Sequence, residues 1–197
     1  MGRGTVTRDR IIQVGSDLIR QHGFAATGLD AILKSAGVPK GSFYYYFPSK
    51  DDFGLAVIDW FASEYDTKLA RFLDDAEVAP LQRLRNFVRD AIRTHGQEGC
   101  RRGCLIGNLG QELAGQNESF RVRLDAVFRA WEGRIAICLE AAQICGEISR
   151  SAAIGTLARF FVVSWEGALL RAKLAKSVAP LEEFEAVLIN KLLQQSS

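Results

Sequence analysis

The chain has 197 residues, of which 48% are hydrophobic and 24% are charged, and it contains only four prolines. This composition is typical of one or two globular domains and excludes a disordered or fibrous protein. No apolar run approaches the roughly 18 residues of a membrane span, and the N-terminal segment lacks the apolar stretch of a secretory signal. We therefore expect a cytoplasmic protein without a membrane partner.

The charges are distributed unevenly, although the net charge is only +2. Residues 1–50 hold seven Lys or Arg against three Asp or Glu, whereas the remaining 147 residues hold 18 against 20. The excess of cations in the first quarter favours an acidic partner there, because phosphate binding needs positive charge on one face. A solvated helical surface would have the same composition.

Apolar residues recur at helical spacing along almost the whole chain and strand-like alternation is absent, so we predict an all-α protein of about nine helices. The first helix is expected over about 7–22, ended by Gly23. Thr27 is placed to cap a short second helix, which Gly37 ends. The predicted buried face of the first helix consists of Ile11, Val14, Leu18 and His22.

A third helix is predicted over Lys40–Phe47, after a tight corner at Gly37–Pro39. Pro48 closes it, and Ser49 is placed to cap a fourth helix, with Asp52 three residues later. Two short helices joined by a glycine-containing turn predict a helix-turn-helix, whose second helix enters the DNA major groove. At about 100° per residue, Phe43, Tyr46 and Phe47 are expected to pack inward, and Gly41, Tyr44 and Tyr45 to face outward.

The order of residues in this region is specific. Between Ile11 and Phe53 the chain carries, in sequence, Gly23-Phe24, Thr27, Ile32, Ala36-Gly37-Val38, Lys40-Gly41, Tyr44, Phe47 and Lys50. This order resembles the DNA-binding domain of the TetR family of bacterial repressors. Pro39 departs from the family, which usually has serine or threonine there, and removes one possible hydroxyl contact with phosphate. The resemblance implies a helix-turn-helix DNA-binding domain over residues 1–50, with a double-stranded DNA operator as its partner.

The resemblance also implies roles for single residues. Thr27, Tyr44 and Lys50 are expected to bind phosphates, and Gly41 to let the backbone come close to the duplex. A lysine and a phenol can hold phosphates without selecting a sequence, whereas a hydroxyl or an aromatic edge can contact bases. The alternative is that the tyrosines are half-buried core residues and the lysines are merely solvated. The residues expected nearest the base edges are Lys40, Ser42 and Tyr45.

Residues 51–197 are predicted to form a helical effector-binding and dimerisation domain of about six helices. A helix over about 118–145 keeps one apolar stripe and is expected to lie in the core. The helix over 152–176 is apolar on more than one side, so we expect a second copy of the chain to cover it together with the last helix, over 181–193. The sequence and the resemblance together predict a two-fold homodimer on a near-palindromic operator.

A small-molecule effector is a further partner that the resemblance implies. In the TetR family the helical body usually holds a pocket whose ligand changes the spacing of the DNA-binding domains, which requires different affinities for two conformations. The sequence itself leaves open whether the effector releases or promotes DNA binding; the resemblance implies release. Trp131 and Trp165 are the candidates for aromatic pocket walls; the alternative is that each belongs to the core.

The segment around Cys104 is the second candidate site. Glycines end the preceding helix, and Cys104 opens the next one behind Arg101 and Arg102. A helix N-terminus and nearby cations favour the reactive thiolate. The segment resembles the Gly-Cys-Leu segment of repressors of the N-ethylmaleimide reductase type in the same family, which sense electrophiles or oxidants with a cysteine there. Cys104 is expected to be a sensor or to line the pocket, with Asn108 and Glu112 one and two turns further on; the alternative is a small buried hydrophobe.

The remaining chemistry argues against an enzyme. A reactive thiol could serve catalysis, but no Ser/His/Asp set, phosphate loop or dinucleotide fingerprint accompanies it. The four cysteines form no CxxC pair and only two histidines exist, so we expect reduced thiols, no metal and no cofactor. Cys138 and Cys145 are expected to be packing residues. A helical interaction protein without operator binding is the alternative from a different class.

Overall fold

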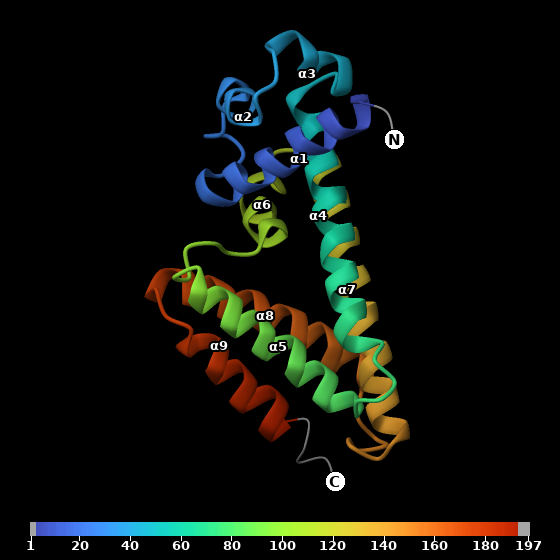
Figure 1. The fold of residues 1–197 in the computed structure, drawn as a ribbon. Helices are drawn as coiled ribbons and strands as arrows, with labels where there is room; N and C mark the ends of the chain where they lie inside the picture. The colour runs from blue at the N-terminus through green and yellow to red at the C-terminus, as the bar shows by residue number, and fades with distance from the viewer. Residues whose placement is uncertain (1–2, 193–197) are drawn as a thin grey trace. The chain divides into compact units, whose positions relative to one another are not determined.

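The computed structural model describes residues 3–192, with side chains described for residues 6–189. Every regular element within residues 3–192 is helical, and the all-α prediction of about nine helices is confirmed (Figure 1). The elements are α1 (Arg3–His22), α2 (Leu29–Ala36), α3 (Lys40–Tyr46), α4 (Lys50–Leu73), α5 (Pro80–Gln97), α6 (Leu105–Leu113), α7 (Glu118–Ile144), α8 (Ile154–Ala175), α9 (Ala179–Phe184) and the π-helix η1 (Glu185–Leu192).

The chain forms two compact units, each made of two segments. The first unit combines the chain up to Glu64 with Leu105–Asp125, and so contains α1 to α3, most of α4, α6 and the start of α7. The second unit combines Tyr65–Cys104 with the chain from Ala126 onward. The predicted domain boundary after residue 50 stays a prediction; it falls where α4 begins, and this helix runs unbroken to residue 73.

The buried face of α1 differs from the predicted one. Gly15 has no side chain, so the ring of Phe53 from α4 lies against the α1 backbone and this side of the helix faces the core. The predicted face was therefore right at Ile11 but wrong for the rest of the stripe. The buried residues of α1 are Ile11, Ile12, Gly15, Ser16 and Ile19, whereas Val14 and Leu18 are half-buried and His22 is exposed.

The start of α2 also differs from the prediction. Gly28 is its N-cap, in an extended conformation and without a side-chain cap. The Thr27 side chain is buried and donates its hydroxyl to the carbonyl oxygen of Gly23 at 2.5 Å. The prediction of Thr27 as the N-cap was wrong, because this hydroxyl closes the preceding turn instead. The end of α2 is as predicted, since Gly37 has a φ of 64° in the left-handed region that suits glycine.

Three phenylalanine rings hold α3 against the start of α4. The rings of Phe43, Phe47 and Phe53 lie with their centroids 5.2 to 5.6 Å apart. The helix is one residue shorter than predicted, because Phe47 is its extended C-cap. Ser49 caps α4 as predicted: its hydroxyl donates to Asp52 at 2.7 Å and accepts the Asp52 backbone N–H at 3.0 Å.

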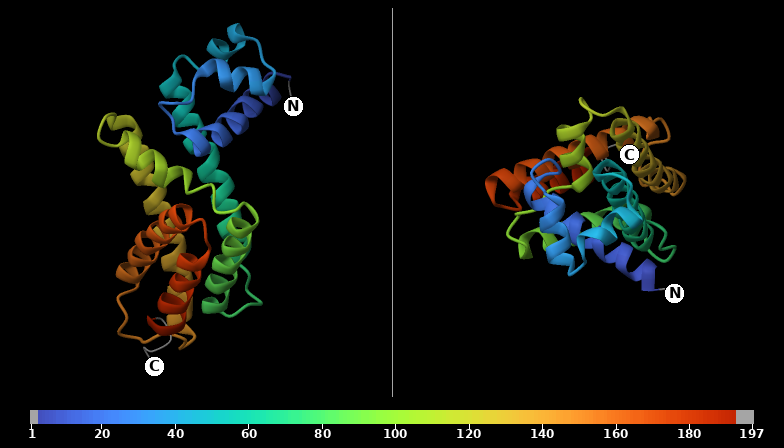
Figure 2. Two further views of the ribbon diagram at one scale, coloured as in Figure 1. Left: turned by 90° about the vertical axis from the view of Figure 1, so that its left-hand side faces the viewer. Right: turned by 90° about the horizontal axis from the view of Figure 1, so that it is seen from above.

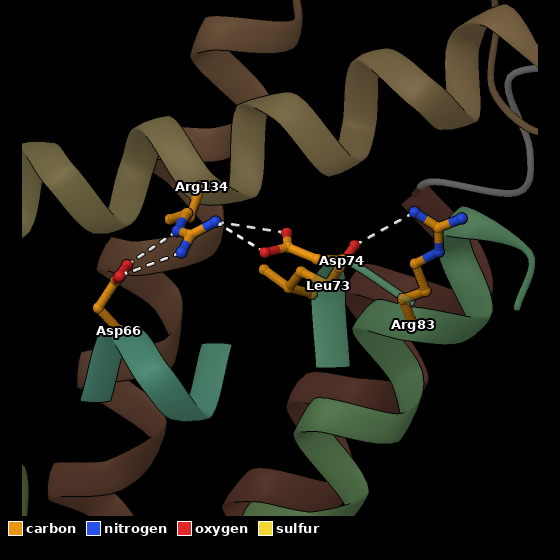
Figure 3. A network of polar contacts seen from close by, with 5 residues as sticks. All are labelled: Asp66, Leu73, Asp74, Arg83 and Arg134. Atoms are coloured by element: carbon orange, nitrogen blue, oxygen red, sulfur yellow. Dashed lines mark hydrogen bonds and ion pairs between the residues drawn. The ribbon is translucent and has the colours of Figure 1, made fainter. Parts of the chain in front are cut away.

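In the second unit, Arg134 of α7 joins Asp66 of α4 to Asp74, which directly follows α4 (Figure 3). Its guanidinium donates two hydrogen bonds to the Asp66 carboxylate, at 2.8 and 3.0 Å, and two more to Asp74, at 3.1 and 3.3 Å. The Arg134 hydrogen bond lowers the pKa of Asp66, although burial opposes this. Next to this network, Arg83 of α5 donates to the carbonyl oxygen of Leu73 at 3.2 Å.

The C-terminal helices complete the second unit. α8 and α9 lie side by side, and α9 and η1 also pack on α5 (Figure 2). Glu185, the first residue of η1, accepts a hydrogen bond from Arg89 Nε at 2.7 Å. The bounds of α7 and α8 lie within two residues of the prediction. The last helix was predicted as one α-helix over 181–193; it is π-helical from Glu185 onward, and residue 193 lies outside the described residues.

Candidate DNA-binding and effector sites

The aromatic side chains of α3 separate as predicted at four of five positions; Tyr46, predicted to pack inward, is only half-buried. Phe43 and Phe47 are 0% and 1% exposed, whereas Tyr44 is 57% and Tyr45 is 82% exposed. The exposed rings rest on neighbours: Tyr44 lies edge-on to Phe43 at 5.4 Å, and Tyr45 lies edge-on to Tyr46 at 4.9 Å. The core rings thus fix α3, and its other side presents two phenols to solvent. This excludes the alternative that Tyr44 and Tyr45 are core residues.

The other predicted base-contacting residues lie at the exposed start of α3. The ammonium of Lys40 is 2.9 Å from the Asp30 carboxylate, and their hydrogen bond raises the pKa of Lys40. Both side chains are exposed, so this ion pair is weak and a phosphate or base can replace the aspartate. Gly41 has open space where a side chain would lie, so its backbone is accessible. Ser42 is half-buried.

Two predicted phosphate-binding residues make contacts inside the protein. Thr27 donates its hydroxyl to Gly23, as described above. The ammonium of Lys50 donates to the carbonyl oxygens of Phe24 at 2.8 Å and Ala25 at 3.4 Å, and lies 4.7 Å from the centre of the Phe24 ring. An ammonium has three donors, so Lys50 keeps one for a further acceptor. Phosphate binding by Thr27 and Lys50 stays a prediction.

Glu112 of α6 holds the opposite side of the same loop, which runs from Gly23 to Gly28 between α1 and α2. Its carboxylate accepts the backbone N–H groups of Phe24 at 2.9 Å and Ala25 at 2.7 Å. A charge-assisted hydrogen bond is stronger than a neutral one, so α6 is tied firmly to the loop before α2. Glu112 was predicted as a pocket residue; it supports the helix-turn-helix, within the first unit. Asn108 is half-buried on the same helix.

An aromatic cluster lies in the second unit, and we define it as Tyr65, Phe87, Trp131 and Trp165. The rings of Tyr65 and Trp131 are 4.5 Å apart, and those of Phe87 and Trp165 are 6.1 Å apart. The predicted pocket walls, Trp131 and Trp165, are 5% and 4% exposed and border one cavity of about 20 Å³. The cavity is lined by the cluster and by Leu69, Ile135, Phe161, Val162 and Glu166.

Glu166 contributes a carboxyl group to this largely apolar cavity. Burial raises its pKa to about 7, although the thiol of Cys104, within hydrogen-bonding reach, opposes this. Burial also raises the pKa of Tyr65, and the neighbouring Cys104 and Glu166 add to the effect. Neither Tyr65 nor Glu166 was predicted from the sequence. The signal for Glu166 was an acidic residue directly after Trp165, in a helix that is apolar on more than one side.

The indole N–H of Trp165 lacks a partner. Its Nε1 is fully buried and makes no hydrogen bond to any described residue. The indole lies close enough to the Tyr65 hydroxyl to lower the pKa of Tyr65 slightly, against the larger effect of burial. The two groups do not have the geometry of a hydrogen bond. A tryptophan can only donate, and unsatisfied buried donors are rare. One residue that lines the cavity thus has a buried donor without a partner among the described residues.

The cysteines occupy different environments. Cys104 is half-buried and directly precedes Leu105, the first residue of α6, as predicted. Cys138 is buried, donates its thiol hydrogen to the carbonyl oxygen of Pro80 at 3.3 Å, and has its pKa raised to about 12 by burial. Cys138 is thus a packing residue, as predicted. Cys145 is exposed, so its assignment as a packing residue was wrong; it follows the last turn of α7.

One face of α8 and η1 is apolar and open to solvent. A groove of about 330 Å³ runs between α8 and the C-terminal helix, bordered by Phe184 and Leu188 among others. Exposed apolar side chains of this size in one area are characteristic of a surface that binds another protein. The exposed apolar residues are Phe160, Val163, Leu170, Leu174 and Val187. As for membranes, no helix among residues 3–192 has both the length and the apolar character of a bilayer span.

Two family models match the chain. Residues 11–57 match the model of bacterial regulatory proteins of the tetR family, and residues 80–188 match the tetracyclin repressor-like C-terminal domain. The chain belongs to the TetR family. It is a helix-turn-helix transcriptional regulator of the kind that binds DNA and responds to ligands. TetR-family regulators are not enzymes, so the prediction against a thiol-dependent enzyme is confirmed.

Similar proteins cover nearly the whole chain. The transcriptional regulator AcuR of Cereibacter sphaeroides is 45% identical over 91% of this chain and 82% of its own length. A crystal structure of the regulatory protein TetR from Rhodobacter sphaeroides has a TM-score of 0.90 at 41% identity, over 94% of this chain and 98% of that one. A crystal structure of the reduced form of NemR from Escherichia coli has a TM-score of 0.88 at 30% identity, over 97% of this chain and 98% of that one. The predicted resemblance to the NemR type is therefore confirmed.

Proposed function

We propose that this TetR-family protein is a repressor that binds a near-palindromic DNA operator as a homodimer and is released by a small-molecule or electrophilic effector. The presentation of Tyr44 and Tyr45 at the surface, on a helix fixed by buried rings, carries the proposal. A protein with this function acts on the chromosome in the cytoplasm. The gene beside its own is the first candidate target.

The DNA-binding surface is the exposed side of α3 together with the loop before α2. Lys40, Ser42 and Tyr45 approach the base edges, and the Gly41 backbone comes close to the duplex. Tyr44 binds phosphate. Thr27 and Lys50 support the loop before α2, and Lys50, at the start of α4, binds a phosphate with its third donor. Asp30 is displaced from Lys40 on binding, because their ion pair is exposed.

Fluorescence anisotropy with duplexes from the DNA flanking the gene tests operator binding. The affinity should fall with salt, since bound phosphates release counterions. Lys40→Ala should weaken binding. If the lysine binds phosphate, the slope of log affinity against log salt concentration should also become shallower by about 1. Lys34→Ala, an exposed lysine on α2, is the matched control and should have a smaller effect. Salt-independent binding, or no binding to any flanking duplex, would favour a helical interaction protein instead.

The apolar face of α8 and η1 is the proposed dimer interface. Leu170 and Leu174 are one turn apart on α8 and exposed, and a second copy would cover them. Replacing both with glutamate should give a monomer in sedimentation equilibrium at micromolar concentration. The exposed Ile137→Glu on α7 is the control and should leave the mass unchanged. A monomeric wild-type chain would contradict the interface.

The effector acts at the aromatic cluster and Cys104. Cys104 immediately precedes α6, and α6 holds the loop before α2 through Glu112. A change at Cys104 therefore has a short covalent path to the helix-turn-helix. Treatment with one equivalent of an electrophile should abolish the gel shift of the wild type but not of Cys104→Ser. Cys145→Ser, which removes the exposed thiol, should behave as the wild type.

A further inference from the structure

The peptide group between Phe24 and Ala25 is bound at both ends by charged side chains. Its N–H, on Ala25, donates to the Glu112 carboxylate at 2.7 Å, and its carbonyl oxygen, on Phe24, accepts a hydrogen bond from the Lys50 ammonium at 2.8 Å. Glu112 comes from α6 and Lys50 from the start of α4, so two elements far apart in the chain hold one peptide group of the loop before α2. All four residues belong to the first unit.

The planarity of the peptide bond couples these two contacts. The described residues contain no cis peptide bond, and in a trans peptide the N–H and the C=O point in opposite directions. When Glu112 fixes the N–H of Ala25, it therefore also fixes the direction of the Phe24 carbonyl, toward Lys50. The two charges polarise the amide in the same sense, so each hydrogen bond strengthens the other. The second hydrogen bond of Glu112, from the Phe24 N–H at 2.9 Å, fixes the preceding peptide group as well.

The Lys50 ammonium lies in a site that this loop forms. Besides the Phe24 carbonyl, it donates to the Ala25 carbonyl oxygen at 3.4 Å, and it lies 4.7 Å from the centre of the Phe24 ring. The Phe24 ring is itself held in place, because its centroid lies 5.3 Å from that of Phe120 and both rings pack on Gly54, where a Cβ atom would not fit. An ammonium has three donors, so this arrangement leaves one donor for an acceptor outside the protein.

A lysine that is held in place before binding loses less conformational entropy when it binds a phosphate. Immobilising a side chain with many rotamers at an interface lowers affinity by roughly 2- to 12-fold. Without Glu112, the loop peptides can turn their carbonyls away, and Lys50 then loses the acceptors that hold it. The affinity of Lys50 for a phosphate therefore depends on a carboxylate that does not itself contact the lysine.

We propose that Glu112 is a positioning residue for DNA binding: through the peptide group between Phe24 and Ala25, it holds the Lys50 ammonium in place for a phosphate of the operator. This inference deepens the proposed function and rests on the phosphate contact of Lys50. It gives α6, which lies outside the helix-turn-helix, a part in operator affinity in the absence of any effector.

The proposal predicts the opposite sign from the charge of Glu112. An acid in the unit that binds the operator repels the phosphates, so its replacement by glutamine should strengthen binding if only charge matters. If Glu112 positions Lys50, the same replacement should weaken binding. The glutamine amide accepts one backbone N–H with its oxygen but meets the other N–H with its own donor group, so it cannot hold both peptide groups.

Operator affinity of the full-length protein at one salt concentration, measured by fluorescence anisotropy, tests this sign. Glu112→Gln should bind roughly 2- to 12-fold more weakly for each protomer on the operator. Glu112→Asp keeps the charge but is one methylene shorter, so it should also bind more weakly. Asp51→Asn is the matched control. Asp51 is exposed, directly follows Lys50 and accepts a hydrogen bond from Asn117 rather than from the loop, so this variant should bind as tightly as the wild type or more tightly.

A double-mutant cycle shows whether Glu112 acts through Lys50. Lys50→Met keeps the length of the side chain without the ammonium and should itself weaken binding. Glu112→Gln should then cause no further loss, because the group that Glu112 positions is gone. The same loss of affinity from Glu112→Gln with and without the ammonium would overturn the proposal, as would binding by Glu112→Gln at least as tight as that of the wild type. Glu112→Asp takes the place of Glu112→Gln in the cycle if the latter does not fold.

Acetylation of Lys50 in the DNA-free protein tests the same coupling without an operator. Two carbonyls engage the Lys50 amine, so it should react with acetic anhydride more slowly than the exposed Lys34 of the same chain. In Glu112→Gln, the ratio of the Lys50 rate to the Lys34 rate should rise by roughly 2- to 12-fold, as expected for the loss of one hydrogen bond. Peptide-resolved mass spectrometry measures the ratio, and an unchanged ratio would overturn the proposal.

The two measurements separate this inference from the proposed function. If the wild type binds no flanking duplex, the proposed function fails, and the acetylation ratio decides whether Glu112 holds Lys50. If Lys50→Met binds with wild-type affinity, the phosphate contact of Lys50 fails, and the role of Glu112 in DNA binding fails with it. If Lys50→Met binds weakly but Glu112→Gln binds like the wild type, the phosphate contact stands and the positioning role of Glu112 is overturned.

Discussion

The exposed side of α3 and the aromatic cluster place their polar groups in opposite environments. Lys40 and Asp30 pair in solvent, where the partners can be exchanged for phosphate at little free energy. Trp165 and Glu166 lie against a small apolar cavity, where an unpaired donor or a bare charge is unfavourable. The first region is thus suited to reversible contact with a polyanion, and the second to a strong response to one small molecule.

The largest expected effect distinguishes the two sides of α3. Phe43→Ala removes a fully buried ring that contacts Phe47 and Phe53, and should lower the free energy of unfolding by about 3–5 kcal/mol. Tyr45→Ala should change it by less than about 0.5 kcal/mol, because the ring is largely exposed. Urea unfolding followed by circular dichroism measures both. Equal losses in the two variants would refute the division of α3 into a core side and a DNA side.

The next effect concerns the support of the helix-turn-helix by α6. Glu112→Ala leaves the backbone N–H groups of Phe24 and Ala25 without their acceptor, and should destabilise the protein by about 1–3 kcal/mol. The same variant should weaken the response of DNA binding to the effector, because α6 no longer holds the loop. Thermal unfolding and effector titration in a gel shift measure these changes. Gln111→Ala, at an exposed neighbouring residue, is the control. Equal losses of stability and of effector response in this variant would contradict the specific role of Glu112 in holding the loop.

A smaller effect appears in the pH dependence of stability. Burial raises the pKa of Glu166 from 4.5 to about 7, so the folded chain binds more protons than the unfolded chain within this range. Stability should therefore fall as pH rises from about 4.5 to 7. Glu166→Gln should remove this fall. The free energy of unfolding of the variant should exceed that of the wild type by on the order of 1–2 kcal/mol at pH 8, and by less at pH 5. Thermal melts of both proteins at pH 5 and pH 8 test this prediction. An equal difference in stability between the two proteins at both pH values would contradict it.

The smallest effect lies in the network of Arg134. Its hydrogen bonds lower the pKa of Asp66, so their contribution is present above the ordinary pKa of 3.8 and is lost as pH falls through the lowered value. Asp66 and Asp74 are half exposed, so Arg134→Ala should cost only about 0.5–1 kcal/mol at pH 7. Melting curves at pH 7 and pH 3 should show a smaller loss at pH 3 than at pH 7, because pH 3 lies below the ordinary pKa of 3.8. Arg150→Ala, at an exposed arginine, is the control. An equal stability difference between Arg134→Ala and the wild type at pH 7 and pH 3 would argue against an ionic origin of the contribution of Arg134.

The sequence predicted α3 well, because its features follow from local rules. Pro39 and Pro48 bound the helix, and a period of about 100° separates Phe43 from Tyr44 and Tyr45 without any knowledge of the neighbours. The buried face of α1 was less predictable, since Gly15 is buried only because Phe53 from another helix packs on it. Thr27 was misassigned for a similar reason, as a threonine can equally cap the next helix or close the previous turn.

The proposed effector site was predictable only in part. The large aromatic side chains Trp131 and Trp165 indicated a cluster, and the structure brings them to one cavity. The influence of Cys104 on the pKa of Glu166 joins residues 62 positions apart, and periodicity within one helix carries no information about such a pair. Glu112 was expected beside Cys104 because they share a helical face, but the loop of Phe24 and Ala25 supplies the donors that this carboxylate accepts.

DNA binding by the protein is proposed to depend above all on the exposed phenols of α3. The most direct test is the operator affinity of the double variant Tyr44→Ala, Tyr45→Ala, measured at one fixed salt concentration beside its melting curve, with the exposed Val122→Ala of α7 as the control. We predict an affinity at least about 10-fold weaker, because the lost contacts are worth roughly 1–3 kcal/mol, with an unchanged melting temperature. Wild-type affinity in the double variant would contradict it.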